Sequence, residues 1–140
     1  MTAHGPKGRK LSEPVLVGLL FADRVIIENN GKRGIIGTFN VFHSQNFPAL
    51  FPPWYIYAAV TNLTGKHTFA LTLVHEESQQ VVVPFNGDFE SPESEVVVEL
   101  TPALMNVTFP RPGTYLLSFS VDGELLGTRI LYVRQAPPGR

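Results

Sequence analysis

The chain has 140 residues, no cysteine and a formal net charge of −1, from 11 Lys and Arg against 12 Asp and Glu. This length fits one domain with its own core, and the lack of cysteine excludes disulfides and thiolate metal sites. The near-neutral charge gives no overall attraction to nucleic acid, and no stretch reaches the roughly 20 apolar residues of a membrane helix. We therefore expect neither nucleic acid nor a membrane as a partner.

A single folded domain is expected over residues 14–133, between disordered tails at residues 1–13 and 134–140. The apolar run near the start of this domain is only 8 residues long and lacks the small-residue cleavage pattern of a signal peptide. The sequence therefore predicts a soluble, cytoplasmic protein.

The domain is predicted to open with an antiparallel β-hairpin. Residues 14–28 and 32–42 are rich in β-branched and aliphatic side chains, and Asn30-Gly31 lies between them. Asn-Gly favours a type I′ turn, because both central residues of that turn need positive φ.

Three residues interrupt the regular pattern of this hairpin. Gly34 and Gly37 inside the second strand indicate a bulge or a close approach of another chain segment. Asp23 follows an apolar run inside the first strand. The structural interpretation is a carboxylate that accepts backbone N–H bonds at a bulge, and the functional alternative is a contact to a ligand.

The segment 43–53 cannot be a central strand, because its three prolines lack the N–H that a strand donates to its neighbour. We expect this segment to cross from one sheet to the other. Residues 54–63 and 67–76 then resume strands, with apolar side chains on alternate positions.

The next part of the chain is predicted to be less regular. Residues 79–85 read as a short strand, placed at an edge or a strand end by Pro84. Residues 86–95 are polar and acidic and are expected to form a loop. Residues 96–109 are expected to form two strand pieces broken near Pro102, with a short helical turn at that proline as the alternative.

A second antiparallel hairpin is predicted at the end of the domain. A Pro-Gly turn at 112–113 leads into an alternating strand, and Asp-Gly at 122–123 favours a type I′ turn before the returning strand 124–133. Tyr115, two residues after the first turn, matches the tyrosine corner of immunoglobulin-like domains, whose hydroxyl bonds back to the chain. About eight strands separated by turns predict an all-β, immunoglobulin-like, two-sheet antiparallel β-sandwich.

Four short motifs carry a resemblance to a known family, and they are L-F-A-D-R-V at 20–25, N-G-K at 30–32, P-G-T-Y at 112–115 and D-G at 122–123. Together they resemble a family of uncharacterised bacterial immunoglobulin-like β-sandwich proteins, a domain of unknown function, over about residues 14–133. The resemblance implies the fold and a bacterial origin, and it implies no activity. The family often has cysteine where this chain has Ala22, so no thiol role is implied there.

Metal binding is not predicted. His67 and His75 lie at the two ends of one expected strand, about 26 Å apart at roughly 3.3 Å per residue, so they cannot share an ion. A weak calcium site is the alternative to a solvated loop for four acidic residues, which are Asp88, Glu90, Glu93 and Glu95. These residues lack the regular ligand spacing and positioned glycine of a calcium loop.

Catalysis is not predicted either. The chain has no G-x-S-x-G nucleophile elbow, and its glycine-rich stretch at 31–37 precedes no helix that could cradle a phosphate. We therefore expect no catalytic residue, no metal and no cofactor, and a protein that is not an enzyme.

The best candidate for function is an aromatic segment. Its candidate interaction surface consists of Phe47, Leu50, Phe51, Trp54, Tyr55 and Tyr57. Exposed aromatic side chains mark binding sites, and the structural alternative is that they plug one end of the fold. We predict a protein-interaction or assembly module that binds a protein partner or self-associates as a homodimer. The alternative is a small-ligand site of the carbohydrate-binding kind, with Trp54, Tyr55 and Tyr57 as stacking platforms.

Overall fold

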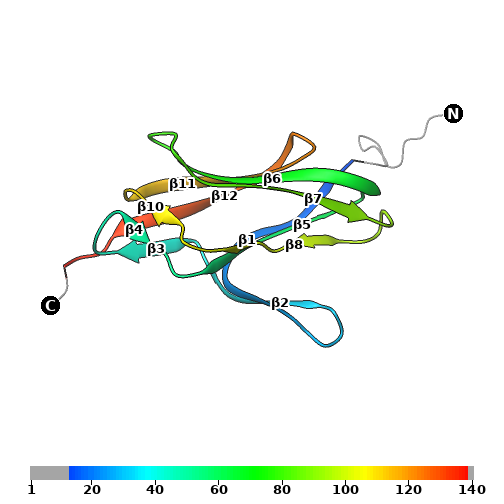
Figure 1. Ribbon diagram of the computed structural model, residues 1–140, viewed down its shortest axis with the longest axis horizontal. Coiled ribbons are helices and arrows are strands. Elements are labelled where there is room, and N and C mark those ends of the chain that lie inside the picture. The colour runs from blue at the N-terminus through cyan, green and yellow to red at the C-terminus, as the bar shows by residue number, and fades with distance from the viewer. Residues whose placement is uncertain (1–12, 139–140) are drawn as a thin grey trace.

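Figure 1 shows the computed structural model, which describes residues 13–138. The described residues form twelve strands and no helix, so none of them builds a helix that could cross a membrane. The strands are β1 (Val15–Ile27), β2 (Arg33–Phe39), β3 (Val41–Ser44), β4 (Ala49–Leu50), β5 (Trp54–Thr61), β6 (Gly65–His75), β7 (Val81–Ser91), β8 (Val98–Leu100), β9 (Ala103–Leu104), β10 (Thr108–Phe109), β11 (Gly113–Val121) and β12 (Glu124–Gln135).

Two five-stranded sheets make up the body. Sheet A has the order β2-β1-β5-β8, with β9 also paired to β5, and sheet B has the order β3-β12-β11-β6-β7. The all-β prediction is confirmed, and the expected number of about eight strands is wrong. The difference arises because β4, β9 and β10 are two-residue pairings, and because the predicted strand 32–42 divides into β2 and β3.

One hydrophobic core lies between the sheets. Ile56, Ala58 and Val60 on β5 are fully buried, as are Leu71 and Leu73 on β6, at every second position of each strand. Alternation of this kind turns one face of a strand into the core. Each fully buried Leu or Ile side chain contributes roughly 1.5–3 kcal/mol relative to its exposed state.

The first hairpin is confirmed, and its turn differs from the prediction. β1 and β2 pair in antiparallel register from Phe21 with Phe39 to Ile27 with Arg33. Gly31 alone has positive φ in the turn, at 87°, so the turn is not type I′. The Gly31 N–H donates to the Glu28 carbonyl, which closes a type I turn followed by a left-handed glycine.

The β1–β2 ladder is interrupted at Asp23 and Gly37, although the register is the same on both sides. Gly37 has a φ of 72°, and a Cβ there would collide with the Asp23 carboxylate. The close approach predicted at the glycines is therefore confirmed, whereas no extra residue of a bulge is present. Beyond this point the hairpin leaves the body and projects below β8 (Figure 1), and we call residues 24–36 the hairpin arm.

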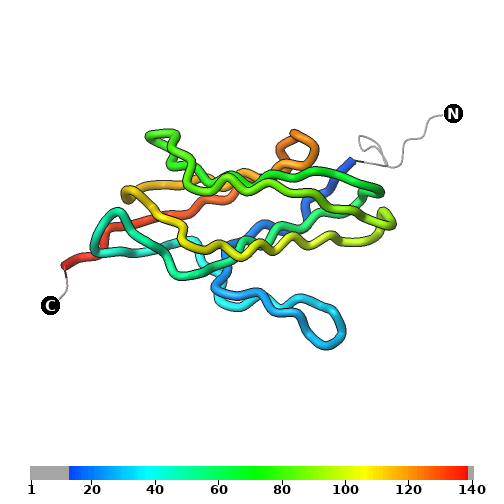
Figure 2. The backbone as a smooth tube through the Cα atoms, in the orientation of Figure 1, coloured from blue at the N-terminus to red at the C-terminus, as the bar shows by residue number. Residues whose placement is uncertain are grey.

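The chain changes sheets twice between β2 and β5. β2 belongs to sheet A, β3 to sheet B and β5 to sheet A again, so the predicted crossover between sheets is confirmed. β3 lies parallel to β12, with Val41 opposite Tyr132, which makes sheet B mixed rather than purely antiparallel. The tube in Figure 2 shows the crossing segment at the end of the molecule near the C-terminus.

β7 is longer than the sequence indicates. The predicted loop 86–95 is wrong over residues 86–91, which pair with β6 as far as Ser91 with Gly65. Phe89 and Ser91 take inward positions, and Asp88 and Glu90 take the exposed positions between them. The exposed carboxylates dominate the composition of this segment and hide its alternating pattern.

The remaining boundaries differ by a few residues. The break near Pro102 is confirmed between β8 and β9, and no helical turn forms there. β12 continues to Gln135, two residues into the predicted C-terminal tail. The predicted N-terminal tail lies outside the described residues except for Glu13.

The C-terminal hairpin follows the prediction closely. Asp122 and Gly123 both have positive φ, at 51° and 82°, as a type I′ turn requires. Tyr115 is fully buried, and its hydroxyl donates a hydrogen bond to the Arg111 carbonyl at 2.5 Å. The backbone bond expected of a tyrosine corner is therefore present.

Replacing Tyr115 with Phe should lower the free energy of unfolding by about 1 kcal/mol, because the Arg111 carbonyl loses its intramolecular donor. Urea denaturation followed by circular dichroism measures this change. Tyr132→Phe is the matched control, since that half-buried ring on β12 should be affected by less than about 0.5 kcal/mol. Equal losses in the two variants would contradict the role of the hydroxyl.

Candidate functional site

Most of the aromatic segment 47–57 lies inside the fold. Trp54 is 2% exposed, and its ring lies 5.8 Å from Phe21 and 5.7 Å from Phe51. Phe47 and Phe51 are partly buried against the same core. These rings close the end of the core where the crossing segment passes between the sheets.

The remaining candidates of this segment differ in exposure. Tyr57 is buried at 9% exposure, Tyr55 is half-buried and Leu50 is 63% exposed. The stacking platform expected from Trp54, Tyr55 and Tyr57 is therefore not formed on the surface. The structure brings Phe47, Phe51 and Trp54 together at the core, whereas Tyr55 and Tyr57 lie on the other face of β5 and Leu50 is exposed.

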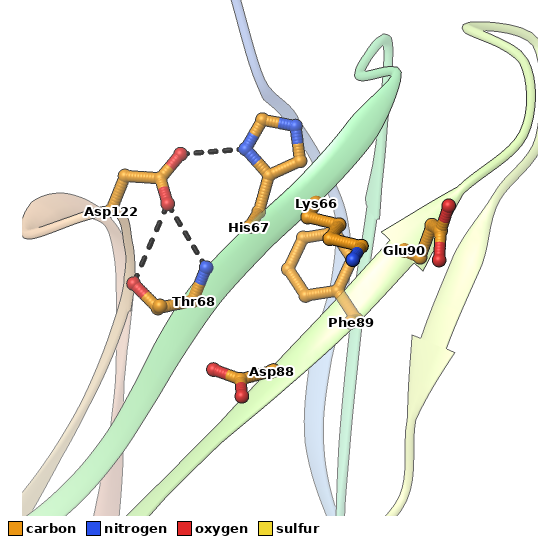
Figure 3. Close-up of a pocket in the computed structure, with 7 residues that line it drawn as sticks. All are labelled: Lys66, His67, Thr68, Asp88, Phe89, Glu90 and Asp122. Carbon is orange, nitrogen blue, oxygen red and sulfur yellow. Dashed lines mark hydrogen bonds and ion pairs between the residues drawn. The ribbon is translucent and has the colours of Figure 1, made fainter.

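A surface cavity of about 540 Å³ lies on β6 and β7 beside the β11–β12 turn (Figure 3). Its lining consists of Lys66, His67, Thr68, Asp88, Phe89, Glu90 and Asp122. Figure 3 shows the Asp122 carboxylate turned toward His67 and Thr68, with Asp88 and Glu90 on the neighbouring strand.

Hydrogen bonds occupy both nitrogens of His67. Nδ1 lies 2.6 Å from Asp122 Oδ2, and Nε2 lies 2.8 Å from the Thr64 carbonyl. The bond to Asp122 is the main cause that raises the pKa of His67, and the same bond lowers the pKa of Asp122. A ring with both nitrogens bonded to oxygen acceptors has none left to act as a general base.

The four acidic residues weighed as an alternative calcium site do not converge. Asp88 and Glu90 point outward from β7, while Glu93 and Glu95 lie exposed in the turn after it. Over residues 13–138, no group of three or more His, Cys, Asp or Glu side chains could hold a metal ion.

A second cavity of about 480 Å³ lies between the first half of β7 and residues 103–108. Val81 and Met105 line it and are 49% and 62% exposed. Leu50 is the register partner of Thr108, which also lines the cavity. The exposed side chain of the aromatic segment therefore lies next to this groove.

The hairpin arm is a surface that sequence reasoning missed. It exposes three isoleucines, namely Ile26 at 44%, Ile27 at 67% and Ile36 at 38%. A run of apolar residues in a strand looks the same whether it faces a core or water, so the local pattern held no signal of this exposure.

Side chains tie the arm to the body near its turn, since Arg33 is the register partner of Ile27. Arg33 Nη1 donates to Glu99 Oε1 at 3.4 Å, and the Tyr57 hydroxyl donates to Glu99 Oε2 at 2.5 Å. Burial and then the Glu99 hydrogen bond raise the pKa of Tyr57 to about 12. Because β5 turns Ile56 and Ala58 into the core, Tyr57 lies on the opposite face of sheet A, where its ring lies next to Gly18 and its hydroxyl bonds to Glu99.

These features define an all-β domain with two sheets around one core, a projecting hairpin and, among residues 13–138, no cluster of side chains that could hold a metal ion. A family of unknown function, DUF6941, matches residues 18–134, and the chain belongs to that family. A search of curated proteins found no match.

Trp54 is the single tryptophan of the chain, so its fluorescence reports on the aromatic end of the core. The emission should be blue-shifted and resist quenching by iodide, because the indole is 2% exposed. Urea unfolding should shift the emission to the red and restore quenching. Emission of a solvated tryptophan in the folded protein would contradict this placement.

The pH dependence of the His67–Asp122 pair follows from the two pKa directions. Since the pKa of His67 rises from 6.5 on folding, its contribution to stability is complete below that value and is lost as pH rises through the folded pKa. Since the pKa of Asp122 falls from 3.8, its contribution is complete above that value and is lost as pH falls through the folded pKa.

Replacing Asp122 with Asn should therefore lower the pKa of His67 toward 6.5, because the main cause of the shift is removed. Titration of the imidazole signals by NMR measures this, with His67→Gln to assign the resonance. Glu124→Gln, two residues further along the same turn, is the control and should leave the pKa unchanged. A His67 that titrates at or below 6.5 in the unaltered protein would contradict the pairing.

Proposed function

We propose that this domain is a non-enzymatic interaction module whose hairpin arm docks onto another protein chain. The observation that carries the proposal is the exposure of Ile26, Ile27 and Ile36 on a hairpin outside the core. Exposed apolar side chains grouped on one element mark protein-binding surfaces more often than scattered ones do.

The attachment of the arm to the body supports docking. Arg33 and Tyr57 both bind Glu99, which holds the turn end of the arm against sheet A before any partner arrives. A surface that is already ordered loses less conformational entropy on association, so more of its contact energy appears as affinity.

The charges of the arm favour a protein over nucleic acid as partner. Arg24, Glu28 and Lys32 place both signs on a short hairpin, and Arg33 is paired with Glu99. Binding to a phosphate backbone depends on several unpaired cations in a row, and the arm does not offer them.

The aromatic segment supports a binding role less than the arm does. Trp54 and Tyr57 are buried, so a carbohydrate ring has no tryptophan face on which to stack. Leu50 and the groove beside it remain a secondary surface for the protein-interaction role.

For the fold we infer a two-layer immunoglobulin-like β-sandwich. Two sheets that share one core support this classification, and so does the Tyr115 hydroxyl bonded back to Arg111.

Affinity capture from cells that express the protein tests the function. The Ile26→Ser/Ile27→Ser variant should capture at least about tenfold less of the partner than the unaltered domain does. Each isoleucine buried on binding contributes roughly 1.5–3 kcal/mol. Leu125→Ser is the control, since Leu125 is 58% exposed on β12, away from the arm. Equal capture by the unaltered domain and the arm variant would show that the proposal is wrong.

A further inference from the structure

The sheet edges within residues 13–138 differ in how well they are protected from pairing with another strand. On sheet B, β7 carries Pro84, which cannot donate, and β3 has only four residues. On sheet A, β8 has only three residues, whereas β2 has seven and contains no proline. The single charged residue of β2 is Arg33, which is bound to Glu99. β2 is therefore a long edge strand that has neither a proline nor an unpaired charge to prevent pairing with another strand.

The direction of the backbone groups on β2 follows from the turn. The Glu28 N–H donates to the Lys32 carbonyl, so this pair is hydrogen-bonded. Hydrogen-bonded and non-bonded pairs alternate along an antiparallel ladder, and the register is constant from Lys32 to Ile36. Arg33 and Ile35 therefore direct their N–H and C=O groups away from β1, toward the side where no described strand lies.

Gly34 and Ile36 lie two residues apart on β2 and differ in what they present to a neighbouring strand. Gly34 has no side chain, and Ile26 on β1 lies next to the space where its Cβ would be. Ile36 is on the same face as Gly34 and is 38% exposed. Because the Ile26 side chain already covers Gly34, a side chain from a strand paired next to Gly34 would meet Ile26.

We propose that β2 pairs antiparallel with β2 of a second copy of this chain, about a two-fold axis at Ile35. This inference rests on the proposed function, since it names the chain onto which the arm docks. The axis places Ile36 of each copy opposite Gly34 of the other, and Ile35 opposite its own counterpart. The free backbone groups of Ile35 then bond to each other across the axis.

Charge is compatible with this register. Residues 34–39 carry no charge, and Lys32 of one copy stands opposite Thr38 of the other. Like charges directly opposite each other would destabilise the pairing, and none face each other in this register. Because the contact involves about five residues of each copy, it is at the small end of protein interfaces, and we expect a dissociation constant in the micromolar range.

Sedimentation equilibrium or light scattering, from about 1 µM to about 1 mM protein, measures the association. The unaltered chain should change from monomer to dimer over this range. Ile36→Lys should weaken the dimer at least tenfold, because it places a charge over Gly34 and Ile26 of the other copy. Ile130→Lys is a matched control, since Ile130 is also a strand isoleucine with 38% exposure.

Disulfide trapping tests the register without relying on a loss of binding. The chain has no cysteine, so Ile35→Cys introduces the only thiol. Across a hydrogen-bonded antiparallel pair the Cα atoms lie about 5.5 Å apart, within the roughly 4.4–6.8 Å of disulfides. Oxidised glutathione should convert this variant to a covalent dimer at least tenfold faster than Ile130→Cys.

The outcomes separate the two proposals. A chain that remains monomeric at the highest concentration, or that dimerises equally well with Ile36→Lys, overturns pairing through β2. If the arm variant still loses a different captured protein, the proposed function survives that result. If the chain is monomeric and the arm variant has no effect on capture, both proposals are wrong.

Discussion

One acidic side chain, Glu99, determines where the projecting hairpin lies. It accepts hydrogen bonds from Tyr57 on β5 and from Arg33 at the start of β2, so it joins the outer face of sheet A to the arm. Without this contact the arm would be a two-stranded ribbon attached through Asp23 and Gly37, and isolated two-stranded hairpins are marginally stable in water. The ordered position of the exposed isoleucines therefore depends on a polar contact rather than on the core.

The two faces of sheet A consequently have different roles. The inner face packs Ile56, Ala58 and Val60 against sheet B and supplies the stability of the body. On the outer face Tyr57 is buried and its hydroxyl bonds to Glu99, and the arm presents apolar side chains to solvent. Natural proteins limit such exposure unless the surface has a partner. In the proposed function, the body is the support and the hairpin is the part that binds another protein chain.

The sequence was informative where local rules decide the structure. The hairpins at Asn30-Gly31 and Asp122-Gly123 and the buried positions of β5 follow from turn chemistry and alternation. The burial of Trp54 was left open, because a proline-rich aromatic segment can cover a core or project from it. The arm could not be predicted, since Arg33 and Glu99 are 66 residues apart and no local pattern links them. The same reason explains why the exposed isoleucines were not recognised as a candidate site.

A double-mutant cycle between Arg33 and Glu99 tests most directly whether the arm is held against the body. Urea unfolding of Arg33→Ala, Glu99→Ala and the double variant gives the coupling free energy of the pair. Because both side chains are about one-quarter exposed, the account predicts a favourable coupling of roughly 0.5–1 kcal/mol that weakens in high salt. A coupling of zero, with the two single losses simply adding, would contradict it.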